Sequence, residues 1–577
     1  MMHFDSLRFT SSWVPYVGLV LLGFLGTACG GGASSVQGWP DPHWDGQRRN
    51  VVLISIDSLR RDHVGTYGHK PRYAADIAVS PNLDALAAEG VVFEDAWTTS
   101  SWTLPTHMAL MTGLSDLRHG VETDKFQLDP LRTTLAQRFQ ESGWRTAGYF
   151  SGPFLDPRYG FDRGFDDYQS GMSSQEDFLA RITVENNKRA AVGMQPMDEL
   201  LIKNLRDRIS HWDITSPRIN ALGAAFLSQQ QADAEQPFFL FLHYFDAHYD
   251  HIPDLAEKGL DVLFDPGYQG PFDGSNWYFD ERVMEFEKPF KRLIGDRDLE
   301  HVKALYDAEI HWVDRHIGAI IKQLKDQGLY ESTIIMVVAD HGDEFFDHGS
   351  IGHRSTLFQE QCRIPMILRV PGLTPEGRRV SALTRIYDSA PTLLDYAGAN
   401  SLEEAEGFSM RELVDGQGEP RSAFQRIFSG GHRKAHGLNI RDGWRNAEFS
   451  ILRQFRANPE SHEQEILETL PLIVRSLNSP FLVFDRHNDP LELHPLSPQD
   501  PRFQQAVAAY CGDFRVAEVA NRKLPKSERS VLVGAKRSAE EQAVLDELGY
   551  TGTSASDGNA IDIMEMLLAP LAEPCAD

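Results

Sequence analysis

From about Asn50 onward the chain alternates short, almost wholly apolar runs with longer amphipathic stretches. The apolar runs have the composition of buried strands and cover residues 50–57 (NVVLISID), 145–150 (RTAGYF), 237–245 (PFFLFLHYF), 332–342 (STIIMVVADHG) and 364–372 (IPMILRVPG). The amphipathic stretches predict helices over 80–90, 131–143 and 300–328. Near-continuous apolar strands that alternate with helices indicate a sheet covered on both faces. The pattern therefore predicts an α/β fold with a doubly wound, mostly parallel sheet.

Two stretches interrupt this alternation, and a third region follows it. Residues 171–230 and 251–300 have the pattern of insertions, and loops of that kind often shape a substrate pocket. Beyond residue 400 the alternation fades, although 479–496 suggests strands and 538–550 a terminal helix. We therefore expect a signal peptide at 1–29, a flexible tether at 30–48, a catalytic domain at 49–400, a smaller C-terminal α+β domain at 401–552 and a tail at 553–577.

The N-terminal segment predicts a location outside the cytoplasm. Its apolar run is too short for a comfortable membrane span, and it ends in Leu-Gly-Thr-Ala-Cys followed by three glycines. This resembles a bacterial lipoprotein signal, in which Cys29 would be lipidated and would anchor the mature chain to the membrane. A plain secretory signal is the alternative. The protein is accordingly expected in the bacterial cell envelope, or secreted.

The net charge argues against some partners, and the cysteines indicate one buried thiol and one candidate disulfide. The formal net charge of −27 argues against nucleic acid, because a phosphate backbone would be repelled, and it is compatible with a site that concentrates metal cations. Cys362 precedes an apolar run and is expected to be a buried thiol. Cys511 and Cys575 could form a disulfide in an oxidising compartment, although nothing in the sequence requires it.

Polar residues at the ends of the predicted strands indicate a metal site. Asp57 ends the first strand, and Asp340 and His341 follow the strand at 333–339. Parallel strands gather ligands beyond their carboxyl ends, so these groups are expected at one edge of the sheet. The stretch SSWTLPTHMALMTGL adds Thr103 near the start of a short helix, two residues before Pro105. Thr103 could be a helix cap or a nucleophile beside a bound anion.

Several motifs in these segments occur in a familiar order. They are ISIDSLRRDHVGTYG, TLPTHMALMTGLSDLRHGV, GFDRGFDDY, LHYFDAHYDHIP, VVADHGDEFFDHGSIGHRSTLFQE, DSAPTLLDYAGA and FDRHNDPLELHPL. Together they resemble the sulfatases, within the alkaline-phosphatase-like superfamily of metal-dependent hydrolases. The resemblance runs from about Val51 to Ala399 and reappears in the C-terminal region.

The resemblance implies a site, residue by residue. Asp57, Asp340 and His341 would hold a divalent cation, with Ser58 where many relatives have a second Asp. Thr103 occupies the nucleophile position, and His107 stands where sulfatases place an Arg that orients the nucleophile. His248 matches a substrate-binding His, with His243 and His251 as competitors in the same segment. His353 lies where relatives have a basic residue that contacts the anion or the leaving group.

The departures from the family pattern matter for the chemistry. Sulfatases use a Cys or Ser that is oxidised to formylglycine, and Thr103 cannot form that aldehyde because its β-carbon carries a methyl group. The usual Lys and His of a Gly-Lys-Trp-His segment are replaced by Ser151-Gly152-Pro153. Superfamily relatives that use an unmodified Thr act on phosphorus. The site therefore favours phosphate or phosphonate esters, without excluding sulfate.

We therefore expect a metal-dependent hydrolase of sulfate or phosphate esters, acting through a covalent intermediate on Thr103. Its substrate would be a small-molecule, glycan or lipid ester, and its cofactor one divalent cation (Ca²⁺, Mg²⁺, Mn²⁺ or Zn²⁺). One alternative is a phosphodiesterase, phosphonate-ester hydrolase or phospho-group transferase with one or two metals; Asp246 with His248 or His251 and His353 could hold the second. Another is a non-catalytic lipoprotein that binds anionic glycans.

Overall fold

The computed structural model describes most of the chain between residues 46 and 534. The described residues are 46–173, 175–191, 193–197, 213–230, 235–275, 277, 280–285, 291–354, 356–418, 421–429, 439–456, 481–523 and 533–534. They all lie within one compact unit, Trp39–Asp577. Cys29, Cys575 and the predicted signal and tail lie outside the described residues, so the lipidation and the Cys511–Cys575 pairing stay predictions. Cys362 is a buried free thiol, as predicted. Within the described ranges, no helix is long and apolar enough to cross a membrane.

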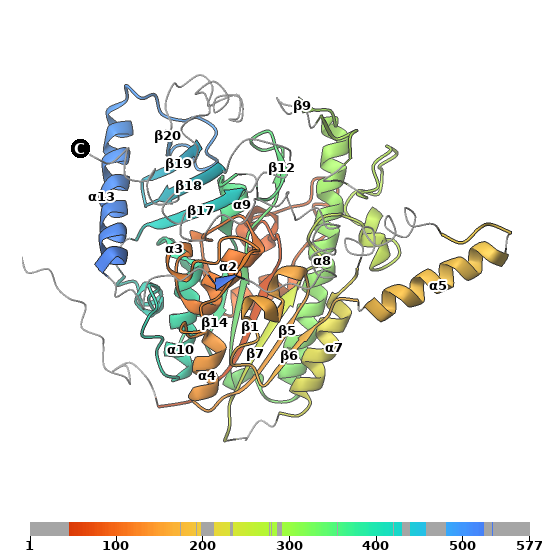
Figure 1. The fold of residues 1–577 in the computed structure, drawn as a ribbon, viewed down its shortest axis with the longest axis horizontal. Coiled ribbons are helices and arrows are strands. Elements are labelled where there is room, and N and C mark those ends of the chain that lie inside the picture. The colour runs from red at the N-terminus through yellow and green to blue at the C-terminus, as the bar shows by residue number, and fades with distance from the viewer. Residues whose placement is uncertain are drawn as a thin grey trace, which may run out of the picture. The chain divides into compact units, whose positions relative to one another are not determined.

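Eight strands form the central sheet, in the order β15-β2-β14-β10-β1-β7-β5-β6 (Figure 1). Their bounds are β1 (Asn50–Ile56), β2 (Val91–Phe93), β5 (Arg145–Phe150), β6 (Asp167–Ser170), β7 (Phe238–Tyr244), β10 (Thr333–Ala339), β14 (Met366–Arg369) and β15 (Arg378–Val380). Strand β1 pairs in parallel with β10 and β7, while β14 is antiparallel to both β10 and β2. Strands β7 and β10 are buried along their whole length. The predicted α/β fold with a mostly parallel sheet is confirmed.

Helices cover both faces of this sheet (Figure 1). On one face lie α1 (Pro81–Ala88), α7 (Ser216–Leu227) and α8 (Asp296–Asp326), and on the other α2 (Thr103–Thr112), α4 (Leu135–Glu141) and α10 (Ser389–Ala397). Helix α7 packs against β5, β7 and α8. The expectation that 171–230 is wholly an insertion is therefore wrong for α7, whose apolar face completes the sheet's cover.

A second, antiparallel sheet follows in the chain, in the order β17-β18-β19-β20. Its strands are β17 (Ala423–Ser429), β18 (Asn439–Arg445), β19 (Phe449–Arg456) and β20 (Phe481–Asp485). Helix α13 (Pro501–Lys523) packs on β19 and β20, and Tyr510 contacts Trp444 and Phe481 in their common core. This part has the α+β composition that the sequence suggests. The boundary near residue 400 and the other domain limits stay predictions, and residues 538–550 lie outside the described ranges.

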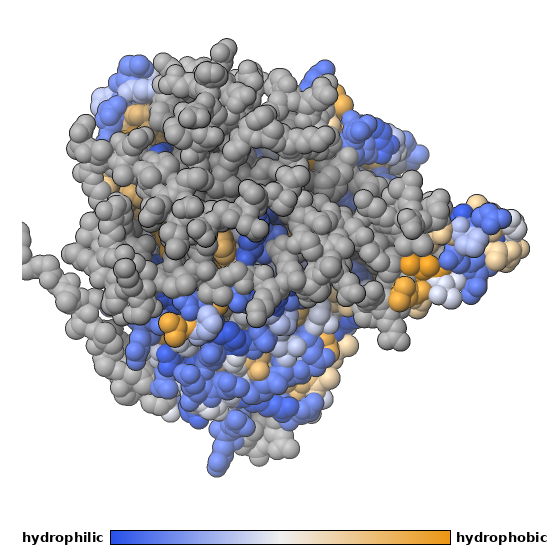
Figure 2. Space-filling view, in the orientation of Figure 1, coloured by the Kyte–Doolittle hydropathy of each residue, from blue (hydrophilic) through white to orange (hydrophobic). Residues whose placement is uncertain are grey.

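Shorter elements complete the described chain. They are α3 (Asp116–His119), α5 (Gln175–Ala191), α9 (Gln359–Cys362), α11 (Arg411–Asp415), β3 (Ala96–Trp97), β4 (Phe126–Gln127), β8 (Met284–Glu285), β9 (Lys291–Arg292), β11 (Glu344–Phe345), β12 (Ile351–Gly352), β13 (Arg363–Ile364), β16 (Thr384–Arg385) and β21 (Val533–Gly534). Helix α5 extends away from the central sheet and carries the exposed apolar side chains Leu179 and Val184 beside polar ones (Figure 2). It belongs to the predicted insertion.

Candidate active site

The sheet order brings the predicted metal ligands together. Strand β1 lies next to β10, with Ile56 opposite Ala339, so Asp57 and Asp340 leave neighbouring parallel strands at the same edge. His341 Nε2 lies 3.8 Å from Asp57 Oδ1 and 3.4 Å from Asp340 Oδ2. One ligand atom of each of the three residues lies within 4.8 Å of the others. All three side chains are fully buried, so the convergence predicted from the strand ends is what the fold produces.

Thr103 faces this cluster and does not cap its helix. It is the first residue of α2, whose N-cap residue is Trp102, and no side chain caps that helix. Its hydroxyl oxygen Oγ1 lies 3.4 Å from Asp57 Oδ2 and 3.3 Å from His341 Nε2. Of the two roles that the sequence left open, the geometry favours the nucleophile, because the hydroxyl is turned from the helix's own amides toward the acidic cluster.

Ser58 supports the two carboxylates through hydrogen bonds. Its backbone N–H donates to Asp340 Oδ1 (3.1 Å), and its hydroxyl donates to Asp57 Oδ1 (3.0 Å). Ser58 has a φ of 55°, in the left-handed region that few side chains adopt, and this conformation turns its N–H toward Asp340. The hydroxyl hydrogen of Ser58 is directed to Asp57, and its role as a metal ligand stays a prediction.

The acidic cluster fits a divalent cation. Among the described residues, no Lys or Arg side chain is bonded to Asp57 or Asp340, and Asp340 Oδ2 has no hydrogen-bond partner. Burial raises the pKa of Asp57, but the nearby imidazoles outweigh burial and hold it well below its ordinary range. Burial and the charge of Asp57 raise the pKa of Asp340 well above its ordinary value. Two buried carboxylates without a cation are unfavourable, and carboxylate, imidazole and hydroxyl donors suit Mg²⁺, Mn²⁺ or Zn²⁺.

His107 contacts the backbone of Thr103, and its ring is neutral. Its Nδ1 donates to the backbone carbonyl of Thr103 (2.9 Å), so its Nε2 accepts from the hydroxyl of Ser55 (2.8 Å). Burial lowers the pKa of His107 to about 3. His107 therefore lies beside Thr103, as predicted, and its ring links α2 to β1. The ring is uncharged, whereas the Arg that the family resemblance implies at this position would be positively charged.

His243 also lies at the acidic cluster, although the sequence analysis named it only as a competitor of His248. It lies near the end of β7, paired in register with Ser55, and its Nε2 is 3.5 Å from Asp57 Oδ2. Its ring meets that of His107 edge to face, with centroids 4.8 Å apart. Neither ring nitrogen of His243 has a hydrogen-bond partner. The signal was a polar residue near the end of an otherwise apolar strand, the same rule that identified Asp57.

His353 and His248 form the side of the site opposite β1. His353 Nδ1 donates to Asp343 Oδ1 (2.7 Å), and its ring lies 4.4 Å from that of His341 and 4.9 Å from that of His248. His353 Nε2 is buried without a hydrogen-bond partner. Burial lowers the pKa of both His353 and His248 to about 3. Asp343, which the sequence analysis did not single out, therefore orients a neutral His353 whose second nitrogen is an open acceptor.

His248 is held by its neighbours on the same loop. Its ring stacks on Phe245 at 4.4 Å, and its Nδ1 contacts the backbone carbonyl of Tyr249 at 3.1 Å. Asp246, considered above for a second metal, has another role. Its carboxylate accepts from the N–H groups of Thr215 and Ser216 at the start of α7 and from the indole of Trp312. It fixes a helix end, so that ligand set for a second metal is not assembled.

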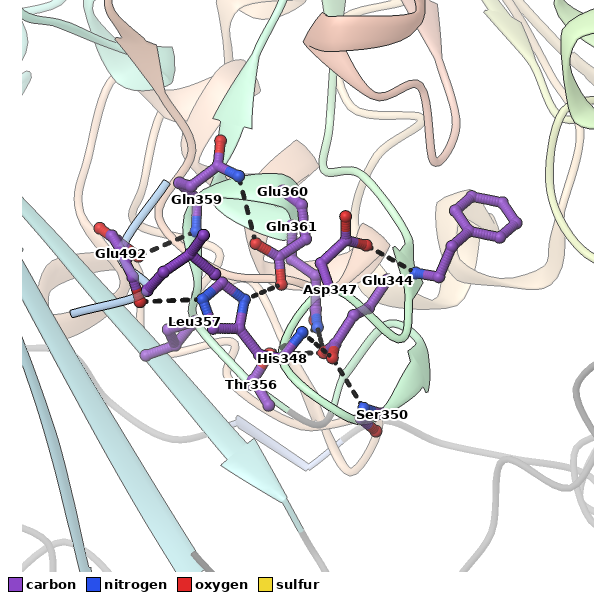
Figure 3. Close-up of polar contacts among 12 residues, drawn as sticks. Glu344, Asp347, His348, Ser350, Thr356, Leu357, Gln359, Glu360, Gln361 and Glu492 are labelled. Atoms are coloured by element: carbon purple, nitrogen blue, oxygen red, sulfur yellow. Dashed lines mark hydrogen bonds and ion pairs between the residues drawn. The ribbon is translucent and has the colours of Figure 1, made fainter. Parts of the chain in front are cut away.

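The loop that carries His353 is fixed by buried carboxylates (Figure 3). Glu344 accepts from the backbone N–H groups of His348 (2.9 Å) and Ser350 (2.7 Å) and from the side chain of Gln361 (3.0 Å). Besides the short pairing of β11 with β12, this network holds the segment between β11 and α9. Asp343 lies just before β11 and His353 just after β12, next to the predicted metal ligands.

The fold and the site define a class: a hydrolase with an acidic metal site at the carboxyl edge of a mostly parallel sheet, of the alkaline-phosphatase-like type. Residues 49–399 match the sulfatase family model, and 346–463 match the model for the C-terminal part of N-sulphoglucosamine sulphohydrolase. The chain belongs to the sulfatase family, and it is a sulfuric or phosphoric ester hydrolase. The family predicted from the motifs is confirmed.

Individual relatives are distant but similar over most of their length. An uncharacterised sulfatase, YidJ of Escherichia coli, is 25% identical over 466 residues, covering 78% of this chain and 83% of the relative. The arylsulfatase of Clostridium perfringens is 24% identical over 410 residues, covering 66% and 81%. Among solved structures, the phosphonate monoester hydrolase of Agrobacterium radiobacter superimposes with a TM-score of 0.56 at 21% identity, covering 82% of this chain and 96% of that one. A 2-O GAG sulfatase does so with a TM-score of 0.59 at 18% identity, covering 85% and 95%.

Proposed function

We propose that this chain cleaves sulfate or phosphate esters by attack of the Thr103 hydroxyl, with the sulfuryl or phosphoryl group passing through a covalent Thr103 ester. The observation that carries the proposal is the position of Thr103 Oγ1, within 3.4 Å of Asp57 Oδ2 and His341 Nε2 and turned from its own helix. The carboxylates alone would oppose loss of the Thr103 proton, so the proposal requires a bound cation to make this oxygen a nucleophile.

Asp57, Asp340 and His341 would hold the divalent cation. When bound, it would lower the pKa of the Thr103 hydroxyl and neutralise charge on the ester oxygens. Thr103 forms a bond to sulfur or phosphorus while the bond to the leaving oxygen breaks. The backbone amides at the start of α2 lie behind the nucleophile and favour the negative charge of the bound group.

His353 is our candidate for the proton carrier. Its Nδ1–H is held by Asp343, and its Nε2 is the unpartnered nitrogen. Nε2 would take the proton that Thr103 loses as it attacks and would pass it to the leaving oxygen. A carboxylate behind an imidazole fixes the ring and stabilises the imidazolium that forms in between. In the second step Nε2 would take a proton from the attacking water, and Thr103 Oγ1 would regain a proton as sulfate or phosphate leaves. His248, whose ring meets that of His353 edge to face, would contact the substrate anion.

Phosphorus esters are the favoured substrates within this proposal. Thr103 cannot be converted to formylglycine, so a sulfatase mechanism that depends on that aldehyde is closed to it. The likeness to a phosphonate monoester hydrolase agrees with this choice, although that relative shares only 21% identity. Phosphonate esters and phosphodiesters are the second candidate substrates, and a non-catalytic protein that binds anionic glycans is the alternative of another class.

The test compares matched aryl phosphate, phosphodiester, phosphonate and sulfate esters after the protein is stripped of metal and reloaded with Ca²⁺, Mg²⁺, Mn²⁺ or Zn²⁺. We expect Thr103→Ala to lower turnover by more than about 10³-fold. Thr112→Ala is the matched control, because Thr112 lies buried on the same helix and its hydroxyl bonds only nearby backbone, donating to Met108 and accepting from Leu114. Quenched reactions should yield a Thr103 peptide heavier by one phosphoryl or sulfuryl group. Unchanged turnover in Thr103→Ala would contradict the proposal, and ligand binding without turnover would favour the glycan-binding alternative.

We also propose that the protein acts outside the cytoplasm, anchored through a lipid on Cys29. The support is the apolar segment that precedes Leu-Gly-Thr-Ala-Cys in the sequence. Metabolic labelling with a radioactive fatty acid should mark the full chain and not Cys29→Ser. Export of an unlabelled chain would indicate the plain secretory signal instead.

A further inference from the structure

A second group of potential metal ligands lies apart from the acidic cluster. His63 belongs to the short 3-10 helix Arg61–His63, His69 follows a turn closed by Gly68, and Asp307 projects from α8. His63 Nδ1 lies 2.7 Å from Asp307 Oδ1, and His69 Nε2 lies 2.9 Å and 3.0 Å from the two oxygens of that carboxylate. Three donor atoms from two segments far apart in the chain therefore converge on one point. We call these three residues the His-Asp-His cluster.

The cluster is nearly enclosed, with one side toward solvent. The side chains of His63 and Asp307 are 8% and 5% exposed, and that of His69 is 14% exposed. The two imidazole rings lie 4.5 Å apart, and the ring of His63 meets that of Tyr306 edge to face at 5.0 Å. Packing of this kind fixes the direction of the nitrogen atoms, which a metal site requires. The partly exposed ring of His69 is the side of the cluster that solvent can reach.

The two imidazoles could serve Asp307 simply as hydrogen-bond donors, but their geometry also suits a shared metal ion. Two imidazole nitrogens aim at the same oxygen, Oδ1, which is the pattern of ligands gathered round an ion. Burial raises the pKa of Asp307, but His63 and His69 lower it more, so the net pKa lies below its ordinary value and the carboxylate is ionised at neutral pH. Tetrahedral Zn²⁺ with bonds of about 2.0–2.1 Å separates its ligand atoms by roughly 3.3 Å. The observed contacts of 2.7–3.0 Å need to open by only a few tenths of an ångström.

We propose that the His-Asp-His cluster is a site for a borderline transition-metal ion such as Zn²⁺, distinct from the catalytic cation. Two nitrogen donors and one carboxylate suit Zn²⁺ or Co²⁺, whereas Ca²⁺ and Mg²⁺ prefer sites built of oxygen. Three protein ligands leave a fourth position for water. The proposal does not depend on the proposed reaction, because none of the three residues contacts Thr103 or its neighbours in the cluster at the sheet edge.

Such an ion would fasten the segment after Asp57 to α8. Tyr306 already joins the two, because its hydroxyl accepts from the N–H of Arg60 (2.8 Å) and donates to the carbonyl of Ser58 (2.7 Å). Asp307 is the next residue of α8, so the ion would extend the same connection from residues 58–60 to residues 63–69. A metal here would therefore act on stability, and its loss should leave the ester chemistry in place.

The test is a titration of the metal-free protein with Co²⁺, followed by its visible absorption and by metal analysis. We expect His69→Gln and Asp307→Asn each to bind one equivalent fewer than the wild type. We expect Asp340→Asn to lose a different equivalent, so that His69→Gln/Asp340→Asn loses two. The affinity of the cluster should fall by more than about 100-fold in His69→Gln. His494→Gln is the matched control, because the side chain of His494 is 84% exposed and belongs to neither cluster.

Two readouts separate the metal site from a hydrogen-bonded cluster. Zn²⁺ should raise the midpoint of thermal unfolding in Asp340→Asn, and this shift should vanish when His69→Gln is added. Asn at position 307 keeps an oxygen that can accept from one imidazole, so Asp307→Asn is expected to fold, and circular dichroism checks it. Equal Co²⁺ equivalents in the wild type, His69→Gln and Asp307→Asn would overturn the proposal, as would a Zn²⁺ shift that survives in His69→Gln/Asp340→Asn.

Discussion

Two sets of buried carboxylates in this chain are neutralised in different ways. Glu492, in the turn after β20, is paired with Arg445 of β18, with Nε and Nη2 each 3.0 Å from one of its oxygens. Asp57 and Asp340 at the sheet edge are just as buried, but within the described residues only imidazoles, two hydroxyls and backbone amides contact them. The Glu492 carboxylate has its counter-charge within the fold. Asp57 and Asp340 have none in the part of the chain that the structure describes, and our proposal is that a cation from solution supplies it.

The largest effect is expected from removing one of the two carboxylates, Asp57 and Asp340, that lack a Lys or Arg partner among the described residues. Asp340→Asn removes one buried charge next to Asp57 while keeping an oxygen that can accept from Ser58. Turnover should fall by about 10³-fold or more, because several kcal/mol of metal-dependent stabilisation is lost. The metal-free variant should unfold at the same temperature as the wild type or above it, because a like charge has been removed. A clear drop in the stability of the metal-free protein would mean that Asp340 holds the fold together as Glu492 does.

The paired set should behave in the opposite way. Arg445→Met leaves Glu492 buried without a cation, and we expect the free energy of unfolding in urea to fall by about 3 kcal/mol. Turnover per folded molecule should stay near that of the wild type. Arg445→Met/Glu492→Gln should recover much of the loss, because no charge is then stranded. Arg502→Met is the control, because Arg502 pairs with Asp500 at the surface, where an ion pair contributes little. A large loss of turnover in folded Arg445→Met would place the pair in the site.

Strand periodicity predicted the five longer apolar strands of the central sheet but not the short β2, β6 and β15, and the strand ends predicted which candidate ligands converge. Residues 145–150 form β5 as predicted, and Asp57, Asp340 and His341 converge because parallel neighbours end at one edge. The second sheet was harder, because β17–β19 alternate apolar with charged residues and bury Arg445. A buried Arg is recognisable only once its partner is known, and Glu492 lies far along the chain.

The remaining errors concern side-chain partners. Sequence position put His107 beside Thr103 but could not show that its ring is neutral and bonded to Ser55. His243 and Asp343 were not chosen, because each is one polar residue among several in its segment, and only the pairing of β1 with β7 and the fold of the 343–353 loop bring them to the site. Asp246 was considered for a second metal together with His248 or His251 and His353, whereas the start of α7 takes up its oxygens.

A third buried carboxylate, Glu360, is paired with a histidine, His348, whose charge depends on pH. His348 stacks on Phe358, with its Nδ1 2.8 Å from Glu360 Oε1 and its Nε2 2.9 Å from the carbonyl of Glu492 (Figure 3). Burial lowers the pKa of His348, but the charge of Glu360 and its hydrogen bond outweigh burial and raise the pKa from 6.5 to about 9. The stability from this pair should therefore be complete below pH 6.5 and should be lost as the pH rises through 9.

The measurement is the free energy of unfolding of the wild type and of His348→Gln at pH 6 and at pH 9.5. The difference between them should shrink by about 2 kcal/mol from the lower to the higher pH, which discounts the full shift for solvent relaxation. His494→Gln, at an exposed position, should show no such change. A difference that stays constant with pH would mean that His348 acts through packing on Phe358 and not through its charge.

The smallest effect is expected from Ser58→Asp, which adds a third carboxylate beside Asp57 and Asp340. Ser58→Asp replaces the hydroxyl that donates to Asp57 with an acceptor, and Asp tolerates the left-handed conformation that this position requires. Without metal, the added charge should lower the free energy of unfolding by about 1 kcal/mol. With Ca²⁺, which prefers several oxygen ligands, the affinity should rise by about tenfold and the variant should unfold above the wild type. Ser58→Ala loses the same hydrogen bond without adding charge, so it should be destabilised with and without Ca²⁺. If Ser58→Asp followed Ser58→Ala in both conditions, the edge would not be completed by a cation, and the contrast with Glu492 and Arg445 would fail.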